Sequence, residues 1–199
     1  MTGPLDRLTS SIPEPWDTVV DWAVIIAIAV AAVLAIKTWV VNPYRIPSSS
    51  MEPTLHCAAP EPGCKAGSSD RVLANRFIYR FRDPERGDIA VFETPERAAR
   101  RCGAGGTFVK RLIGLPGERI SVSDGVVLID GEPLEEPYVN GGRSGRDFAA
   151  RTLGDDEYFM MGDNRGQSCD SREWGPVERD DLIGPVFAVY WPLPRLGLR

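Results

Sequence analysis

The chain is poor in the residues on which most hydrolases depend. His56 is its only histidine in a sequence of 199 residues. A Ser-His-Asp triad would have to use this one residue, and a catalytic zinc ion needs about three protein ligands. We therefore predict that the chain holds no metal and no cofactor, and that His56 is an exposed residue of a loop.

The chain also lacks a net positive charge. The formal net charge is −5 and the isoelectric point is about 5.0. Proteins that bind nucleic acid usually present a broad cationic surface that neutralises phosphates. Arg97, Arg100 and Arg101 form the one basic cluster, which we interpret as a solvated loop, with contact to lipid headgroups as the alternative. Nucleic acid is therefore not a predicted partner.

Only one apolar run is long enough to cross a membrane. Every residue from 22 to 36 is apolar, and after Lys37 and Thr38 the run resumes as far as residue 41. At ~1.5 Å per residue, residues 22–41 can span a ~30 Å hydrocarbon layer, so we predict a transmembrane helix there. A cleaved signal peptide is the alternative. It would need a basic leader, whereas residues 1–21 hold four acidic residues and one arginine.

Beyond residue 43 the sequence changes to short runs with the composition of strands. The runs cover residues 71–81, 88–93, 107–115, 120–122, 126–129, 158–161 and 182–191. Ser123-Asp124-Gly125 and Asp130-Gly131 are typical of hairpin turns. We predict a disordered tail at 1–21, the helix at 22–41, and a mainly antiparallel β catalytic domain at 42–199.

Ser50 is the first candidate for chemistry. It lies in the segment 46–55, where Pro47 and Pro53 bracket three consecutive serines. Proline restricts its own backbone and that of the preceding residue, so this segment is expected to be stiff and extended. Such a segment can hold a nucleophile in place, although most serine-rich stretches are plain loops.

Lys110 is the second candidate. Apolar residues surround it in sequence, among them Phe108, Val109 and Leu112. Burial lowers the pKa of a lysine by up to about 3–5 units, and a neutral amine can replace histidine as a general base. The alternative is that the Lys110-Arg111 pair lies on an exposed strand edge.

A third polar block runs from residue 162 to residue 175, with the sequence Gly-Asp-Asn-Arg-Gly-Gln-Ser-Cys-Asp-Ser-Arg-Glu-Trp-Gly. Its structural interpretation is a polar turn closed by Asp170 and Arg172. Its functional interpretation is a scaffold from which the Ser168 hydroxyl orients the lysine amine.

In motif and order these blocks resemble the bacterial type I signal peptidases, which are membrane-anchored Ser/Lys proteases that remove signal peptides from exported proteins. The resemblance covers the apolar anchor and residues 46–55, 86–92, 107–118, 162–175 and 184–192. It implies a single-pass serine endopeptidase of the cell membrane, with its β catalytic domain on the extracytoplasmic side and no metal or cofactor. The implied partners are the lipid bilayer and preproteins whose signal peptides have small residues before the cut.

The resemblance also implies roles for individual residues in catalysis. Ser50 would be the nucleophile that forms an acyl-enzyme, and Lys110 would be the general base. The Ser48 hydroxyl and the Ser50 backbone N–H would form the oxyanion hole. Ser168 would donate a hydrogen bond to the Lys110 amine and so orient it.

Two further sets of residues would support the site. Asp170 and Arg172 would brace the loop that carries Ser168. The shallow pockets for small substrate residues would be lined by Ile46, Pro47, Met51, Leu55, Phe108 and Val109. The chain departs from the family pattern at Ser49, where glycine is common, and at Gly166-Gln167, which replaces an Asp-Asn pair. These departures leave the geometry of both loops open.

Two other functions are consistent with part of the pattern. A self-cleaving repressor uses the same Ser/Lys chemistry, but it would carry an N-terminal DNA-binding module and an internal Ala-Gly cut site. A membrane-anchored β module that binds envelope components without catalysis would tolerate alanine at Ser50 or Lys110.

The four cysteines form an even set, which favours pairing in an oxidising compartment. Cys57 and Cys64 are seven residues apart around a loop that is short enough to close on itself. The second pair follows from the resemblance: if Ser168 contacts the lysine, Cys169 lies beside the lysine strand, and Cys102 can fold back across a glycine-rich turn. We predict Cys57–Cys64 and Cys102–Cys169, with four reduced thiols or a Cys-His zinc site as alternatives.

Overall fold

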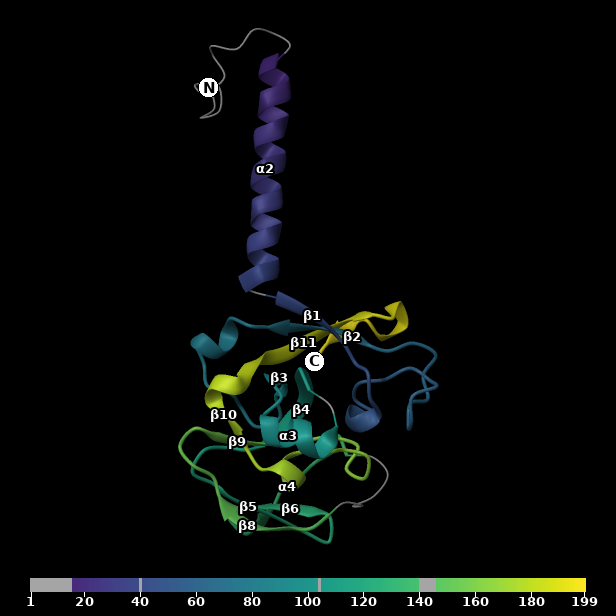
Figure 1. Ribbon diagram of the computed structural model, residues 1–199, viewed down its shortest axis with the longest axis vertical. Coiled ribbons are helices and arrows are strands. Elements are labelled where there is room, and N and C mark those ends of the chain that lie inside the picture. The colour runs from purple at the N-terminus through teal and green to yellow at the C-terminus, as the bar shows by residue number, and fades with distance from the viewer. Residues whose placement is uncertain (1–15, 40, 104, 140–145) are drawn as a thin grey trace. The chain divides into compact units, whose positions relative to one another are not determined.

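The computed structural model describes residues 16–39, 41–103, 105–139 and 146–199 (Figure 1). The chain divides into two compact units, Met1–Val41 and Asn42–Arg199. The second unit covers the range in which the sequence predicts the catalytic domain.

Helix α2 is the main element of the first unit and covers Trp16–Trp39. It begins earlier than predicted, because residues 16–21 contain no glycine or proline that would stop a helix. These six residues of the predicted tail are therefore helical, whereas residues 1–15 lie outside the described part of the chain. Among the described residues, no helix combines the length and apolarity that a membrane span requires.

The second unit is mainly antiparallel β structure, as predicted. Its larger sheet has the strand order β1-β2-β11-β3-β4-β9-β10, and β12 pairs with β11. The strands are β1 Val41–Arg45, β2 Arg71–Asn75, β3 Ile89–Glu93, β4 Thr107–Gly114, β9 Glu157–Met161, β10 Val177–Glu178, β11 Leu182–Trp191 and β12 Gly197–Leu198. β3 lies at the middle of this order with β4 beside it, and both strands lie in the interior of the second unit (Figure 1).

A smaller sheet has the order β7-β6-β5-β8. Its strands are β5 Arg119–Ser123, β6 Val126–Ile129, β7 Glu132–Pro133 and β8 Phe148–Thr152. Asp124 and Asp130 have φ angles of 50° and 53°, and each is followed by a glycine with positive φ. Two successive residues with positive φ make the type I′ hairpin turn, which confirms both predicted turns.

Helices replace some of the expected loops and strands. The predicted strand at 71–81 ends at Asn75, because the Asn75 side chain accepts the backbone N–H groups of Phe77 and Ile78 at 2.9 and 3.1 Å and starts the 3-10 turn Ile78–Arg80. The arginine cluster, expected in a loop, belongs to helix α3 Glu96–Cys102. The other helical segments are Ser49–Met51, α4 Ser171–Trp174, Arg179–Asp181 and Leu193–Arg195.

One hydrophobic cluster connects the serine segment to the larger sheet. Ile46, Met51 and Leu55 are at most 2% exposed and pack with β2, β3 and β11 residues such as Val72 and Val91. Burying three large side chains within ten residues anchors the segment on both sides of Ser50. The core thus determines where the serine lies.

Candidate active site

Ser50 and Lys110 meet in the interior of the second unit. The Lys110 amine donates a hydrogen bond of 2.5 Å to the Ser50 hydroxyl, across 60 positions of sequence. Ser50 lies in the turn Ser49–Met51, and Lys110 lies in β4 opposite Ala90 of β3. The two side chains are only 7% and 5% exposed. A nucleophile and a base within hydrogen-bond reach are the minimum that covalent catalysis requires.

A buried ion pair holds both ends of the serine segment. The Asp70 backbone carbonyl accepts the Ile46 N–H at 3.0 Å, and its side chain accepts the His56 N–H at 2.9 Å. Arg195 neutralises this carboxylate with contacts of 2.8 and 2.9 Å and donates to the Thr54 carbonyl at 3.0 Å. Asp70 is fully buried, and removing one partner of such a pair is strongly destabilising. The sequence analysis did not identify this pair, because its members are 125 positions apart.

Asn164 fixes the serine turn from the opposite side. Its backbone N–H donates to the Ser50 carbonyl at 3.1 Å, and its side-chain amide donates to the Ser49 carbonyl at 3.0 Å. Nothing in the sequence distinguished Asn164 from the other polar residues of its block. Its role depends on the approach of two loops that are 115 positions apart.

Burial makes the Lys110 amine easier to deprotonate. It lowers the pKa of the amine to about 8, with Arg172 contributing in the same direction, while Asp170 and Asp163 act against the shift. Neither carboxylate forms a salt bridge with the amine in the described structure. Because no ion pair compensates for the lost hydration, the neutral form is favoured. A neutral amine beside a serine hydroxyl can accept its proton.

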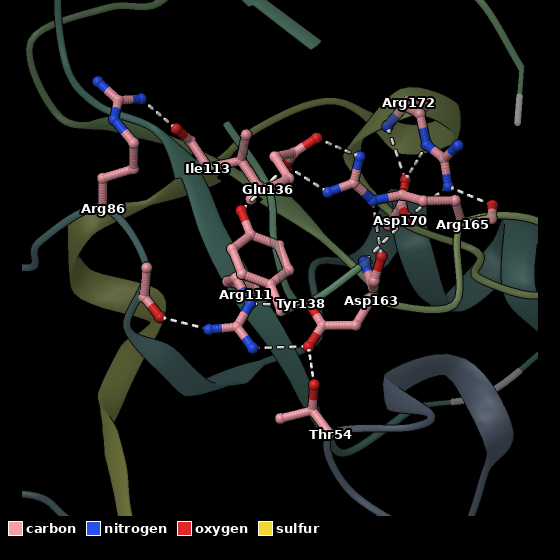
Figure 2. Close-up of polar contacts among 12 residues, drawn as sticks. Thr54, Arg86, Arg111, Ile113, Glu136, Tyr138, Asp163, Arg165, Asp170 and Arg172 are labelled. Atoms are coloured by element: carbon pink, nitrogen blue, oxygen red, sulfur yellow. Dashed lines mark hydrogen bonds and ion pairs between the residues drawn. The ribbon is translucent and has the colours of Figure 1, made fainter. Parts of the chain in front are cut away.

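The neighbouring residue Arg111 is also buried, but it is paired with a carboxylate. Its guanidinium forms two hydrogen bonds with Asp163, at 2.8 and 2.6 Å, and stacks 3.9 Å from the Tyr138 ring (Figure 2). Thr54 donates to the same carboxylate at 2.5 Å. Successive strand residues point to opposite faces, so β4 directs one cation to the serine and the other to this ion pair. Arg111 is therefore not on an exposed edge.

A cavity of about 450 Å³ opens beside the Ser50 and Lys110 side chains. Five of the six residues expected to contact substrate line it: Ile46, Pro47, Met51, Phe108 and Val109. Leu55 does not line it, because its side chain is fully buried in the hydrophobic cluster. Ser48 also borders the cavity, and its hydroxyl lies 3.3 Å from the Ser50 hydroxyl.

The comparisons with known proteins point to one family. A family model described as signal peptidase, peptidase S26, matches residues 19–191. The chain is 38% identical over 200 residues to a probable signal peptidase I-2 of Synechocystis sp., and this alignment covers 100% of this chain and 86% of the relative. It is 38% identical over 175 residues to a signal peptidase I of Leptolyngbya laminosa, and this alignment covers 86% of this chain and 79% of the relative. The chain belongs to the signal peptidase family, peptidase S26.

The membership confirms the family that the sequence motifs indicated. A signal peptidase I P of Bacillus subtilis subsp. natto is 31% identical over 188 residues, covering 89% of this chain and 92% of the relative. The protein is therefore a serine endopeptidase of the signal peptidase I type. The alternative of a non-catalytic binding module is not supported.

Ser168 lies close to the serine turn of this signal peptidase, but it makes a different contact from the one expected. Its hydroxyl is buried and has no hydrogen-bond partner among the described residues, so the expected bond to Lys110 is not formed in this structure. The hydroxyl oxygen and the Ser50 carbonyl oxygen lie 2.3 and 2.4 Å from the position of a Cβ atom on Gly162. Ser168 therefore packs beside the Ser50 main chain.

Asp170 and Arg172 form the expected brace of the signal peptidase loop. Two contacts of 2.8 Å join the carboxylate to the guanidinium, and the carboxylate also accepts the Gly162 N–H at 3.1 Å. Arg172 donates to the Arg165 carbonyl at 2.8 Å. Asp170 caps helix α4 as well, since it accepts the Arg172 backbone N–H. One buried pair thus connects Gly162, the loop and α4.

The two disulfides of the structure join the pairs that were predicted. Cys57 and Cys64 have Cα atoms 5.1 Å apart, and Cys102 and Cys169 have Cα atoms 5.9 Å apart. The second disulfide links the end of α3 to the loop before α4 and lines the cavity beside Ser50.

Removing the two disulfides separately should destabilise the domain to different degrees. Chain entropy predicts a loss of about 4 kcal/mol for a loop of 67 residues and about 2 kcal/mol for one of seven, the separations of Cys102–Cys169 and Cys57–Cys64. Guanidinium unfolding of the Cys102→Ser/Cys169→Ser and Cys57→Ser/Cys64→Ser variants would measure both. Alkylation of all four cysteines in the unreduced native chain would contradict the pairing.

His56 is half-buried rather than exposed, because its Nδ1 atom contacts the Glu52 carboxylate. In the part of the chain that the structure describes, no group of three or more His, Cys, Asp or Glu side chains is placed to hold a metal ion.

Proposed function

We propose that Ser50 is the nucleophile and Lys110 the general base with which this signal peptidase cleaves signal peptides from preproteins. The observation that carries the proposal is the 2.5 Å contact between the two side chains beside an apolar cavity. The lowered pKa of Lys110, about 8, supports its role as base.

The reaction would proceed in two steps. Neutral Lys110 takes the proton of the Ser50 hydroxyl while the serine oxygen attacks the scissile carbonyl. Lys110 then gives that proton to the leaving amine, and the acyl-enzyme remains as an ester. Lys110 next takes a proton from a water molecule, whose oxygen attacks the ester, and returns the proton to Ser50.

The negative charge of each tetrahedral intermediate is stabilised by hydrogen-bond donors. We assign the Ser48 hydroxyl and the Ser50 backbone N–H to this oxyanion hole, and the 3.3 Å separation of the two serine hydroxyl oxygens supports the first assignment. Removal of one such donor typically costs about 2.7–4 kcal/mol of transition-state stabilisation.

The cavity beside Ser50 would take the small residues before the cut. Its walls include Ile46, Met51, Phe108 and Val109. Apolar walls favour short apolar side chains and leave a charged group without hydration. Met51 is only 1% exposed, so a large substrate side chain would displace the core. This arrangement fits a preference for alanine at the first and third positions before the cut.

Ser168 is proposed to orient the base during part of the cycle. When Ser50 becomes an ester, its oxygen loses the hydroxyl proton and Lys110 needs another partner. Ser168 has an unpaired, buried hydroxyl beside the Ser50 main chain. Asp170 and Arg172 would keep that hydroxyl in place through the loop.

The pH dependence of cleavage tests the assignment of the base. Only the neutral amine is active, so kcat/KM should rise about tenfold per pH unit below the Lys110 pKa of about 8 and level off above it. Steady-state rates on one peptide between about pH 6 and 10 would show this, because that range includes both the Lys110 pKa and the ordinary histidine value. An inflection near the ordinary histidine value of about 6.5 that disappears in His56→Gln would contradict it.

The activity itself can be tested with a purified preprotein. Incubation with the full-length enzyme in detergent should yield one new N-terminus after a small residue, identified by N-terminal sequencing. The Ser50→Ala enzyme serves as the control for contaminating proteases. Equal cleavage by both enzymes would refute the proposal.

We also propose that the protein works at the cell membrane, anchored once through residues 22–41, with the catalytic unit outside the cytoplasm. Support comes from the apolar run and from exposed apolar side chains of the second unit, namely Phe77, Phe81, Trp191, Leu193, Leu196 and Leu198. Exposed apolar side chains that gather in one patch can mark a membrane contact. Alkaline extraction of membranes tests the anchor, and protease treatment of intact spheroplasts tests the side.

A further inference from the structure

A second cavity, of about 530 Å³, lies next to the serine turn and is not used in the mechanism above. Its lining includes Glu52, His56, Gly63, Lys65 and Asn164. Unlike the first cavity, it is rich in polar and ionisable side chains. The two cavities have no lining residue in common.

The position of this cavity follows from the chain around Ser50. Residues before the nucleophile, such as Ile46 and Ser48, line the first cavity, whereas Glu52 and His56, which follow it, line the second. Asn164 lies between them, since it lines the second cavity and binds the Ser50 carbonyl. If the acyl part of the substrate occupies the first cavity, the leaving part must extend away from it. The second cavity is placed to receive that part.

The Lys65 ammonium is a hydrogen-bond donor that is left without a partner here among the described residues. Both Glu52 carboxylate oxygens are occupied, one by His56 Nδ1 and the other by the Cys57 N–H at 3.1 Å. Lys65 forms no salt bridge with any described residue, and its side chain is exposed. The second imidazole nitrogen of His56 is also without a partner among the described residues. A ligand with a carboxylate would satisfy the Lys65 ammonium.

Two contacts constrain the loop that forms one wall of the cavity. The Cys57–Cys64 disulfide closes this loop, and the Ser49 hydroxyl donates to the Pro62 carbonyl at 3.0 Å. A Cβ atom on Gly63 would lie 2.5 Å from the Ser49 oxygen, so glycine allows this close approach. Ser49, where the family commonly has glycine, therefore attaches the disulfide loop to the nucleophile turn. A preorganised wall loses less entropy when a ligand binds.

We propose that the second cavity binds an acidic side chain from the first residues of the mature protein, those directly after the cut, through Lys65. The inference rests on the proposed function, because it takes Ser50 as the point of cleavage. The disulfide loop then acts as a specificity element for the leaving part of the substrate. Its contribution is to substrate selection and not to the chemical step.

Peptide substrates that differ only after the cut test this proposal. A series with a constant Ala-x-Ala sequence would carry glutamate, glutamine or lysine at each of the first three positions of the leaving part. A partly exposed ion pair contributes up to about 1 kcal/mol, so the full-length enzyme should prefer glutamate over glutamine by about threefold to fivefold in kcat/KM at one of these positions. The difference should lie in KM.

Variants of Lys65 distinguish binding at this cavity from other causes. Lys65→Gln should bring the glutamate-to-glutamine ratio close to one, and Lys65→Glu should make lysine the preferred residue. Arg119→Gln, which removes one positive charge from the exposed first residue of β5, is the matched control and should keep the ratio of the unaltered enzyme. Lys65 is exposed, so its substitution is compatible with folding.

Two outcomes would overturn the inference, and they differ from a failure of the proposed function. Equal kcat/KM for glutamate, glutamine and lysine at all three positions, or a preference that persists in Lys65→Gln, would refute the acidic-residue site while cleavage continues. Cleavage that does not need Ser50 would instead refute the proposed nucleophile.

Discussion

Ser50→Ala and Lys110→Ala should each abolish signal peptide cleavage, with a loss of roughly 10⁴-fold or more in kcat. Without Ser50 no acyl-enzyme can form. Without Lys110 the serine keeps its proton, because no other base contacts its hydroxyl in the described structure. The two residues act on the same proton, so the double variant should be little slower than either single variant.

Lys110→Arg provides the sharper test of the base. A guanidinium stays protonated at any pH that the protein tolerates, so this variant should be inactive although its charge and length resemble those of lysine. Rates on a preprotein, followed by gel and by N-terminal sequencing, measure all of these variants. Circular dichroism and the melting temperature show whether each is folded, and Ser123→Ala, at an exposed position of β5, is the matched control. Substantial turnover by Ser50→Ala or Lys110→Ala would remove the basis of the mechanism.

Gly162→Ala is expected to cause the second largest loss, although residue 162 carries no reactive group. A Cβ atom there would lie 2.4 Å from the Ser50 carbonyl oxygen and 2.3 Å from the Ser168 hydroxyl oxygen, which is far inside van der Waals contact. The Ser50 contact is with backbone, so no side-chain rotation can relieve it. The serine turn and the Ser168 loop must move apart, and a displacement of about 1 Å can reduce the rate about 10²-fold.

Gly67→Ala is the control for this substitution, because nothing lies within 4 Å of its Cβ position. We expect Gly67→Ala to keep the activity of the unaltered enzyme and Gly162→Ala to lose about 10²-fold in kcat/KM. A crystal structure of the Gly162→Ala variant should show a longer Lys110–Ser50 contact. Full activity together with an unchanged contact would show that the serine turn does not depend on this glycine.

Local sequence was sufficient to predict most of the longer strands and the two residues of the candidate dyad. Alternation of apolar residues and hairpin turns identified β3, β4, β6 and β11 almost to their ends, because strand composition and type I′ turns are local properties. Strands β1, β7, β8, β10 and β12 were missed. β7, β10 and β12 have two residues each, which is too short for any period to appear. β1 and β8 have five residues each but no regular alternation of apolar and polar residues. The turn after Asn75 was missed because it depends on a single side-chain cap.

The sequence alone determined which residues are able to do the chemistry. One histidine, a stiff serine segment and a lysine among apolar residues left few designs for a hydrolase, and the motif order identified the family that the comparisons confirm. What it could not determine is how far apart those groups lie and which of them are paired.

The tertiary structure decided the environment of each group. The two adjacent basic residues of β4 have different hydrogen-bond partners, since Arg111 meets the Asp163 carboxylate while Lys110 meets the Ser50 hydroxyl. It also left Leu55 out of the substrate cavity, left the Ser168 hydroxyl without a partner and placed the disulfide loop against Ser49. Desolvation and ion pairing depend on residues brought together from positions 50 to 125 apart, and no local pattern in the chain encodes those distances.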